Sequence, residues 1–138
     1  MSREILFRGK SLETGEWVHG GYIDVPSGSF IDKIVWDGEK NWKLCAVPVD
    51  PSTVCQYTGL TDENGRKIFE GDILEGRWDD KRPEDVTRAV VEWILFGWYI
   101  HEIGKSMPDE MDESDIDIWT VCGNIWDTPE LLEGGADQ

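Results

Sequence analysis

Short runs of alternating apolar and polar residues follow one another along most of the chain. Such alternation over about four to eight residues is typical of a strand with one buried face. The runs that predict strands are residues 4–8, 16–24, 30–36, 42–47, 53–57, 73–78, 98–103 and 116–123. Gly20 and Gly21 interrupt the second run, which indicates a bulge or a close approach of two backbones.

Turn-forming residues separate these runs. The Asp-Gly pair at 37–38 predicts a tight hairpin, and the Asp-Pro pair at 50–51 would turn the chain before the next strand. Residues 62–65, Asp-Glu-Asn-Gly, have the composition of a polar turn. Gly71 would then supply an unusual backbone angle, and Asp72 would accept backbone N–H bonds at that turn.

Two segments depart from strict alternation. Residues 87–96 are apolar almost throughout, which fits a central strand buried on both faces, although the period also allows a helix. Residues 128–134 carry Thr as an N-cap, Pro at the first helical position, an acid in the first turn and Gly at the end, so they predict a short helix. The charged stretches 79–85 and 104–113 are interpreted as loops.

One short helix against about nine strands places the chain in the mainly-β class. Its 138 residues are enough for one domain with a core of its own. We expect a single domain over residues 1–134, followed by a frayed tail at 135–138. Within it, an N-terminal antiparallel β-layer (1–50) would be joined to a small SH3-like, partly open β-barrel (51–134), with one short C-terminal helix.

The chain is strongly acidic, with 29 acids against 13 bases and a net charge of −16. A field of this sign repels phosphate backbones and suits a partner with a basic surface. The cysteines, Cys45, Cys55 and Cys122, are odd in number and form no CxxC pair, which indicates reduced thiols. No signal peptide and no apolar run of membrane-spanning length is present. We therefore expect a cytoplasmic protein without a membrane association.

Several linked motifs resemble the YopX family of bacteriophage and prophage proteins. They occur in order along nearly the whole chain, at residues 5–10, 15–20, 54–60, 62–65, 68–73 and 121–132. Cys55 stands where the family often has glycine, and Cys122 where it has an aliphatic residue; cysteine is a tolerable small hydrophobe at a buried strand position. The resemblance implies a mostly-β phage or prophage accessory protein that acts inside a bacterial host cell. It implies no activity, because the family is functionally uncharacterised.

The distinctive polar residues allow a recognition role or a structural one. Gln56 and Tyr57 could form a recognition patch with Asp72, but residues beside turns usually satisfy backbone groups or the core, and Asn124 after Gly123 is interpreted as a turn former. The separations among cysteines and histidines show no short ligand pair. We therefore expect no metal, no cofactor and no catalytic residues.

The chain has eight Trp residues, most of which are expected in the core. Trp is favoured at protein–protein interfaces, and Trp36, Trp42 and Trp78 flank turns. Together with Gln56 and Tyr57 they form the candidate interaction surface. The acidic run 109–117 is interpreted as a solvated loop, or else as a contact for a basic partner.

The preferred hypothesis is a protein-interaction module that binds an unknown protein partner or itself, as a homo-oligomer; mimicry of DNA by its acids is a variant of it. The alternative is a nucleic-acid-associated β-barrel module, because basic residues cluster near Trp78 and Trp93: Arg77, Lys81, Arg82 and Arg88. Acids interleave with these bases and cancel their charge, so nucleic acid is not the expected partner. An enzyme is the weakest hypothesis, since no reaction follows from these residues.

Overall fold

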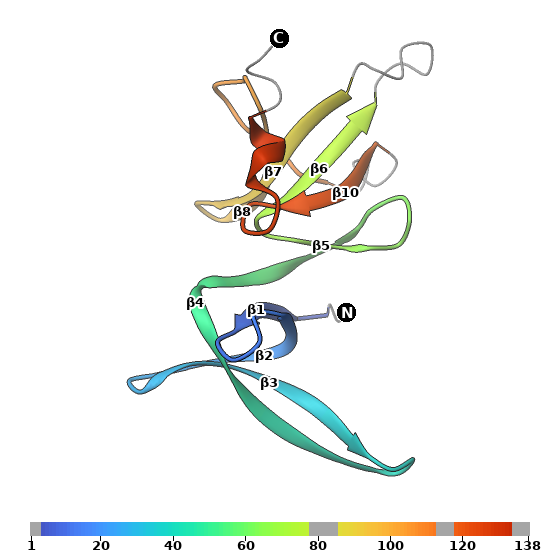
Figure 1. Ribbon diagram of the computed structural model, residues 1–138. Coiled ribbons are helices and arrows are strands. Elements are labelled where there is room, and N and C mark those ends of the chain that lie inside the picture. The colour runs from blue at the N-terminus through green and yellow to red at the C-terminus, as the bar shows by residue number, and fades with distance from the viewer. Residues whose placement is uncertain (1–3, 78–85, 113–117, 134–138) are drawn as a thin grey trace. The chain divides into compact units, whose positions relative to one another are not determined.

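The computed structural model describes residues 4–77, 86–112 and 118–133 (Figure 1). The chain is mainly β, as predicted, with two antiparallel sheets and one 3-10 turn among the described residues. It divides into two compact units, Met1–Tyr57 and Thr58–Gln138. The strands are β1 (Phe7–Ser11), β2 (Trp17–Val25), β3 (Gly28–Asp37), β4 (Asn41–Thr61), β5 (Lys67–Phe69), β6 (Asp72–Arg77), β7 (Val86–Ile94), β8 (Gly97–Glu102), β9 (Asp109–Glu110) and β10 (Trp119–Asn124).

In the N-terminal unit, β2 and β4 each change pairing partner part-way along their length. β2 pairs with β1 up to Gly20 and with β3 from Gly21 onward. β4 pairs with β3 up to Pro48 and with β1 from Val49 onward. Because β1 thereby meets both β2 and β4, this sheet closes partly into a ring. The small core inside it consists of Val18, Ile31 and Val49, packed by Phe7, Tyr22, Val47 and Val54.

Gly20 lies where β2 changes partner, and the predicted close approach of two backbones is confirmed there. A Cβ atom on Gly20 would lie 2.2 Å from the carbonyl oxygen of Asp32 and 3.3 Å from Cγ2 of Ile31. No side chain fits at that distance from a backbone atom. A Cβ on Gly21 would meet no atom within 4 Å.

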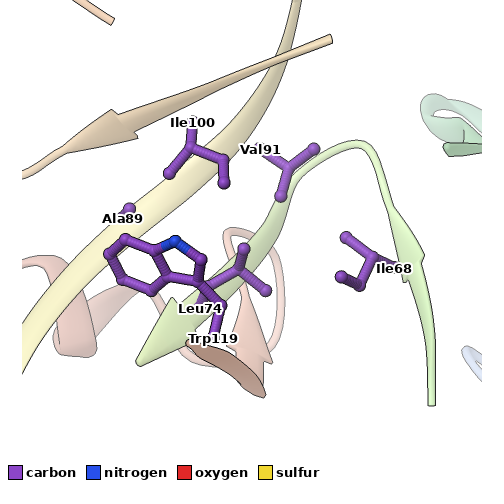
Figure 2. Packing of buried hydrophobic residues seen from close by; sticks show 6 residues of the cluster. All are labelled: Ile68, Leu74, Ala89, Val91, Ile100 and Trp119. Atoms are coloured by element: carbon purple, nitrogen blue, oxygen red, sulfur yellow. The ribbon is translucent and has the colours of Figure 1, made fainter. Parts of the chain in front are cut away.

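The C-terminal unit is built on a sheet with the order β10-β6-β7-β8-β9. Its core cluster draws on β5, β6, β7, β8 and β10, and Figure 2 shows the side chains pointing toward one another: Ile68, Leu74, Ala89, Val91, Ile100 and Trp119. β7 is central, as expected, but only Ala89 and Val91 are buried, while its other face is half-buried. Burial on both faces was therefore a wrong expectation.

Two further expectations need correction. Residues 50 and 51 do not separate two strands, since β4 runs from Asn41 to Thr61 without a break. The β1–β4 register shifts between Arg8↔Cys55 and Lys10↔Asp50, so Pro51 lies in a bulge. Because proline has no backbone N–H, it leaves no unpaired donor there. The acidic stretch 104–113 is also not all loop, because β9 pairs with β8.

The C-terminal helix is a single 3-10 turn, η2 (Pro129–Leu132). Thr128 precedes it but makes no side-chain cap bond. Its hydroxyl instead accepts from the N–H of Asn124 and donates to the carbonyl of the same residue. Gly134 and the tail at 135–138 lie outside the described residues, as does the loop at 79–85. The SH3-like barrel over residues 51–134 stays a prediction.

Asp62 organises the polar turn that the sequence placed at 62–65. Its side chain is 2% exposed. One carboxylate oxygen accepts the N–H groups of Asn64 and Arg66, both at 2.9 Å, and the other accepts the N–H of Val121 in β10 at 3.0 Å. A single carboxylate therefore holds the turn closed and joins it to the last strand.

His101 is held at the surface of β8 by two hydrogen bonds. Its Nε2 lies 2.8 Å from the carbonyl oxygen of Lys105, and its Nδ1 lies 2.9 Å from a carboxylate oxygen of Glu92. Both partners favour the protonated ring. The Lys105 carbonyl first and the Glu92 carboxylate second raise the pKa of His101 above its ordinary value of 6.5.

Replacing Gly20 by alanine tests the close approach at the change of partner. Gly20→Ala should lower the free energy of unfolding by about 1–3 kcal/mol, as overpacking does, because the new methyl group meets a backbone carbonyl. Gly21→Ala is the matched control, and denaturant unfolding should show it close to wild type. Equal effects of the two substitutions would contradict this account of Gly20.

Removing the Asp62 carboxylate should destabilise the protein strongly. Asp62→Ala leaves three backbone donors without their acceptor, and an unsatisfied buried donor costs about 1–3 kcal/mol, so a loss of at least about 3 kcal/mol is expected. Asp62→Asn keeps one acceptor oxygen and should lose less. Urea unfolding of the three proteins measures the difference, and an Asp62→Ala protein as stable as wild type would rule out this role.

The hydrogen bonds of His101 predict a pH dependence. A raised pKa in the folded state means that the contribution to stability is complete below pH 6.5 and is lost as the pH rises through the folded-state pKa. An NMR titration should place the His101 midpoint above 6.5. Glu92→Gln should lower it while the Lys105 carbonyl keeps part of the shift. A midpoint at or below the ordinary value would contradict the geometry.

Candidate interaction surface

The outer half of the β3–β4 hairpin, residues 33–46, is a two-stranded ribbon that we call the arm. β2 accompanies β3 only from Gly28 to Asp32, and β1 meets β4 only from Val49 onward. Beyond these points β3 and β4 pair with each other alone (Figure 1). The predicted hairpin turn is confirmed at its end, where Gly38 has a φ of 90°.

Four large apolar side chains share one side of the arm, which we call the apolar face. Ile34 lies opposite Leu44, and Trp36 lies opposite Trp42. Residues two apart on a strand, and residues directly opposite one another, point to the same side. All four are more than half exposed, at 54% for Ile34, 62% for Trp36, 57% for Trp42 and 56% for Leu44. The apolar face is therefore uncovered along its whole length.

The other side of the arm is polar and basic. It carries Lys33 opposite Cys45 and Val35 opposite Lys43. In the arm as a whole, three lysines stand against two acids, whereas the complete chain has a net charge of −16. The apolar face is thus located on a segment in which bases exceed acids, within an otherwise acidic protein.

The five residues of the predicted surface do not all gather here. Trp36 and Trp42 face each other on the arm. Gln56 lies in a different part of β4, opposite Phe7, and is half-buried. Tyr57 is only 7% exposed, and its N–H donates to the carbonyl of Leu6 at 2.8 Å, so its ring offers little surface. Trp78 lies outside the described residues.

Ile34 and Leu44 were missed as surface residues. They stand two positions from Trp36 and Trp42, inside runs that alternate as a half-buried strand does. The alternation predicts that these two residues share one side of the sheet with Trp36 and Trp42. It does not indicate that this side lacks a covering layer.

A second exposed apolar group lies at the β7–β8 turn. Leu95 is 79% exposed and Phe96 is 95% exposed, with Trp93 beside them at 50%. Leu95 has a φ of 54°, which is strained for a residue with a side chain of this size. Residues 95 and 96 were expected inside a buried strand, whereas they form the turn after it.

The structural interpretation of Asp72 and Asn124 is confirmed. Asp72 is buried and accepts the N–H of Phe69 at 2.7 Å, across the turn where Gly71 has a φ of 84°. Asn124 accepts the N–H groups of Trp126 and Asp127 at 3.0 and 2.8 Å. These polar side chains serve the backbone and offer no recognition patch.

The cysteines are dispersed. Cys55 is buried and accepts a hydrogen bond from Nε of Arg8, whereas Cys45 and Cys122 are exposed. Desolvation by surrounding atoms, followed by the charge of Glu75, raises the pKa of the Cys122 thiol, which works against a reactive thiolate. Among the described residues, no group of three or more His, Cys, Asp or Glu side chains could hold a metal ion.

An open cleft of about 360 Å³ lies in the N-terminal unit. Its walls include Trp17, His19, Lys33 and Cys45, together with the acids Glu13 and Glu16. Acids, a base and an aromatic ring are mixed there, and the mixture favours no single ligand chemistry.

Little of the predicted basic patch can be followed. Lys81 and Arg82 lie outside the described residues, and the side chain of Arg77 is not described. The Nε of Arg88 lies 3.8 Å from a carboxylate oxygen of Glu75, and its Nη1 donates to the carbonyl of Leu131 at 3.4 Å. Arg88 therefore has an ion pair with Glu75 and a hydrogen bond to Leu131, while its buried Nε has no hydrogen-bond partner among the described residues.

Comparison with known proteins identifies the chain by family. The family model described as YopX protein matches residues 6–133. The chain is also similar to the crystal structure of protein EF1440 from Enterococcus faecalis, with a TM-score of 0.65 and 22% sequence identity, covering 95% of this chain and 99% of that one. No curated protein matches it. On the strength of the family match, this chain belongs to the YopX family.

Proposed function

We propose that this chain is a protein-interaction module and not an enzyme, and that it binds its partner through the apolar face of the arm. The observation that carries the proposal is the exposure of Ile34, Trp36, Trp42 and Leu44 on one side of an unsupported strand pair. We further propose that it acts as a phage or prophage accessory protein in the cytoplasm of a bacterial host.

The size of the apolar face supports this role. An aromatic side chain buries roughly 150–250 Å², so two Trp residues at about half exposure, with Ile and Leu beside them, offer roughly 400 Å². That matches the largest apolar patch of a typical monomer, about 300–600 Å², which is often functional. A standard interface takes about 800 Å² from each partner. The apolar face would therefore form the centre of an interface and need a polar rim.

The residue types also support binding. Trp is enriched among the residues that dominate binding energy, and these cluster at the centre of interfaces. A two-stranded hairpin is marginal in water without packing on one face. A partner that covers this face would supply the missing layer.

The partner is an unidentified protein or a second copy of this chain. The negative field of the chain works against nucleic acid, and the engagement of Arg88 with Glu75 and Leu131 removes one of the bases that the nucleic-acid alternative used. In the described parts of the chain, no helix has the length and apolar character of a membrane span.

Truncation of the two Trp residues tests the proposal. Trp36→Ser and Trp42→Ser should each weaken binding about 30-fold or more, the effect of losing about 2 kcal/mol at a central aromatic. The measurements are light scattering of the purified chain, for self-association, and affinity capture from bacterial lysate with wild type and variants in parallel. Both variants should keep wild-type stability, because the rings are exposed.

Phe96→Ser is the control, since Phe96 is a fully exposed aromatic outside the arm. It should leave binding unchanged. A strictly monomeric wild-type protein that retains no partner would contradict the proposal. So would capture that the arm variants and the control affect equally.

A further inference from the structure

The outer edge of β4 in the arm is open. Residues 41–46 pair with β3 on one side, and on the other side the pairing with β1 begins only at Val49. No described residue hydrogen-bonds to this second side of residues 41–46. A row of backbone N–H and C=O groups is therefore exposed beside the apolar face.

An open edge of this kind is a template for another strand. Soluble proteins usually shorten, cover or charge such edges, because main-chain hydrogen bonds otherwise recruit extended segments of other chains. Here six residues stay open, with Lys43 as the one charged side chain among them. The same main-chain bonds give affinity when a peptide adds a strand to a sheet, and alternate side chains give specificity.

The side chains along the edge define what such a segment must carry. On one side of the sheet, Trp42 and Leu44 continue the apolar face. On the other side, Lys43 stands opposite Val35, and Lys33 lies opposite Cys45. A strand added beside β4 presents successive side chains to these two sides in turn. It would meet apolar surface at every second residue, and the residues between would face the polar side of β4, where Lys43 supplies a positive charge.

We propose that residues 41–46 of β4 receive an extended segment of the partner protein as an added strand, and that this segment alternates apolar and acidic residues. This inference rests on the proposed function, because it assigns a binding mode and a partner chemistry to the same arm. An added strand also supplies what the apolar face lacks, since its own side chains extend the interface beyond the four residues of the arm.

The β3 edge of the arm is the weaker candidate. β3 carries Asp32 at the base of the arm and Asp37 at its tip, and both acids would repel the acidic positions of the segment. Residues 41–46 contain no acid. Charge therefore selects the β4 edge.

The probe is a fluorescein-labelled ten-residue peptide in which valine and glutamate alternate, added to the full chain. Fluorescence anisotropy should show saturable binding, at least tenfold tighter than binding of the matching valine–lysine peptide. Lys43→Glu should reduce the preference for the acidic peptide at least tenfold. Lys105→Glu makes the same charge change outside the arm and should have no such effect.

Backbone pairing is tested with the same peptide N-methylated at every residue, which has no N–H group left to donate to β4 from either of its edges. It should lose binding, and hydrogen exchange at residues 41–46 should slow only with the unmethylated peptide. Equal binding of the methylated peptide would overturn strand addition and leave the proposed function standing. Failure of the acidic peptide to bind would also overturn the inference. The proposed function has its own test, which is partner capture with the Trp36 and Trp42 variants.

Discussion

The N-terminal unit depends on one constraint: β2 and β4 each pair with two different strands along successive parts of their length. β2 can pass from β1 to β3 because Gly20 lets the Asp32 carbonyl come closer than any side chain would allow. β4 passes from β3 to β1 between Pro48 and Val49, where proline has no N–H to leave unpaired. These two changes close the sheet into its partial ring and leave the rest of the β3–β4 hairpin without neighbours.

The arm is thus a consequence of how the small core is built. The ring encloses only the short buried cluster around Ile31 and Val49. β1 and β2 stop pairing with the β3–β4 hairpin before the hairpin ends. The side chains beyond that point have no layer to pack against, although they alternate as those of a buried strand do. Their lysines also set them apart from the acidic body of the chain, so shape and charge distinguish the same segment.

Local physics was sufficient to predict most strands and turns. The turn at Gly38 and the polar turn organised by Asp62 follow from residues that tolerate positive φ or cap backbone N–H groups. The continuity of β4 through Pro51 could not be predicted, because it depends on a bulge opposite β1, a strand some forty residues away in sequence. The exposure of Ile34 and Leu44 could not be predicted either, because it also depends on tertiary structure. Alternation specifies which side of a sheet a residue faces, but not what covers that side. Thr128 is a residue type that often caps the start of a helix. Here its hydroxyl instead accepts a hydrogen bond from the N–H of Asn124.

The length of β4 bears on whether the two units of this protein could have evolved as separate modules. The boundary between the two compact units falls between Tyr57 and Thr58, inside a strand that runs unbroken from Asn41 to Thr61. Modules that recombine freely are usually joined by exposed linkers that few contacts cross. Here the junction is a hydrogen-bonded strand, so a genetic exchange at this point would cut through a structural element of both halves. The two units are therefore expected to have been inherited together.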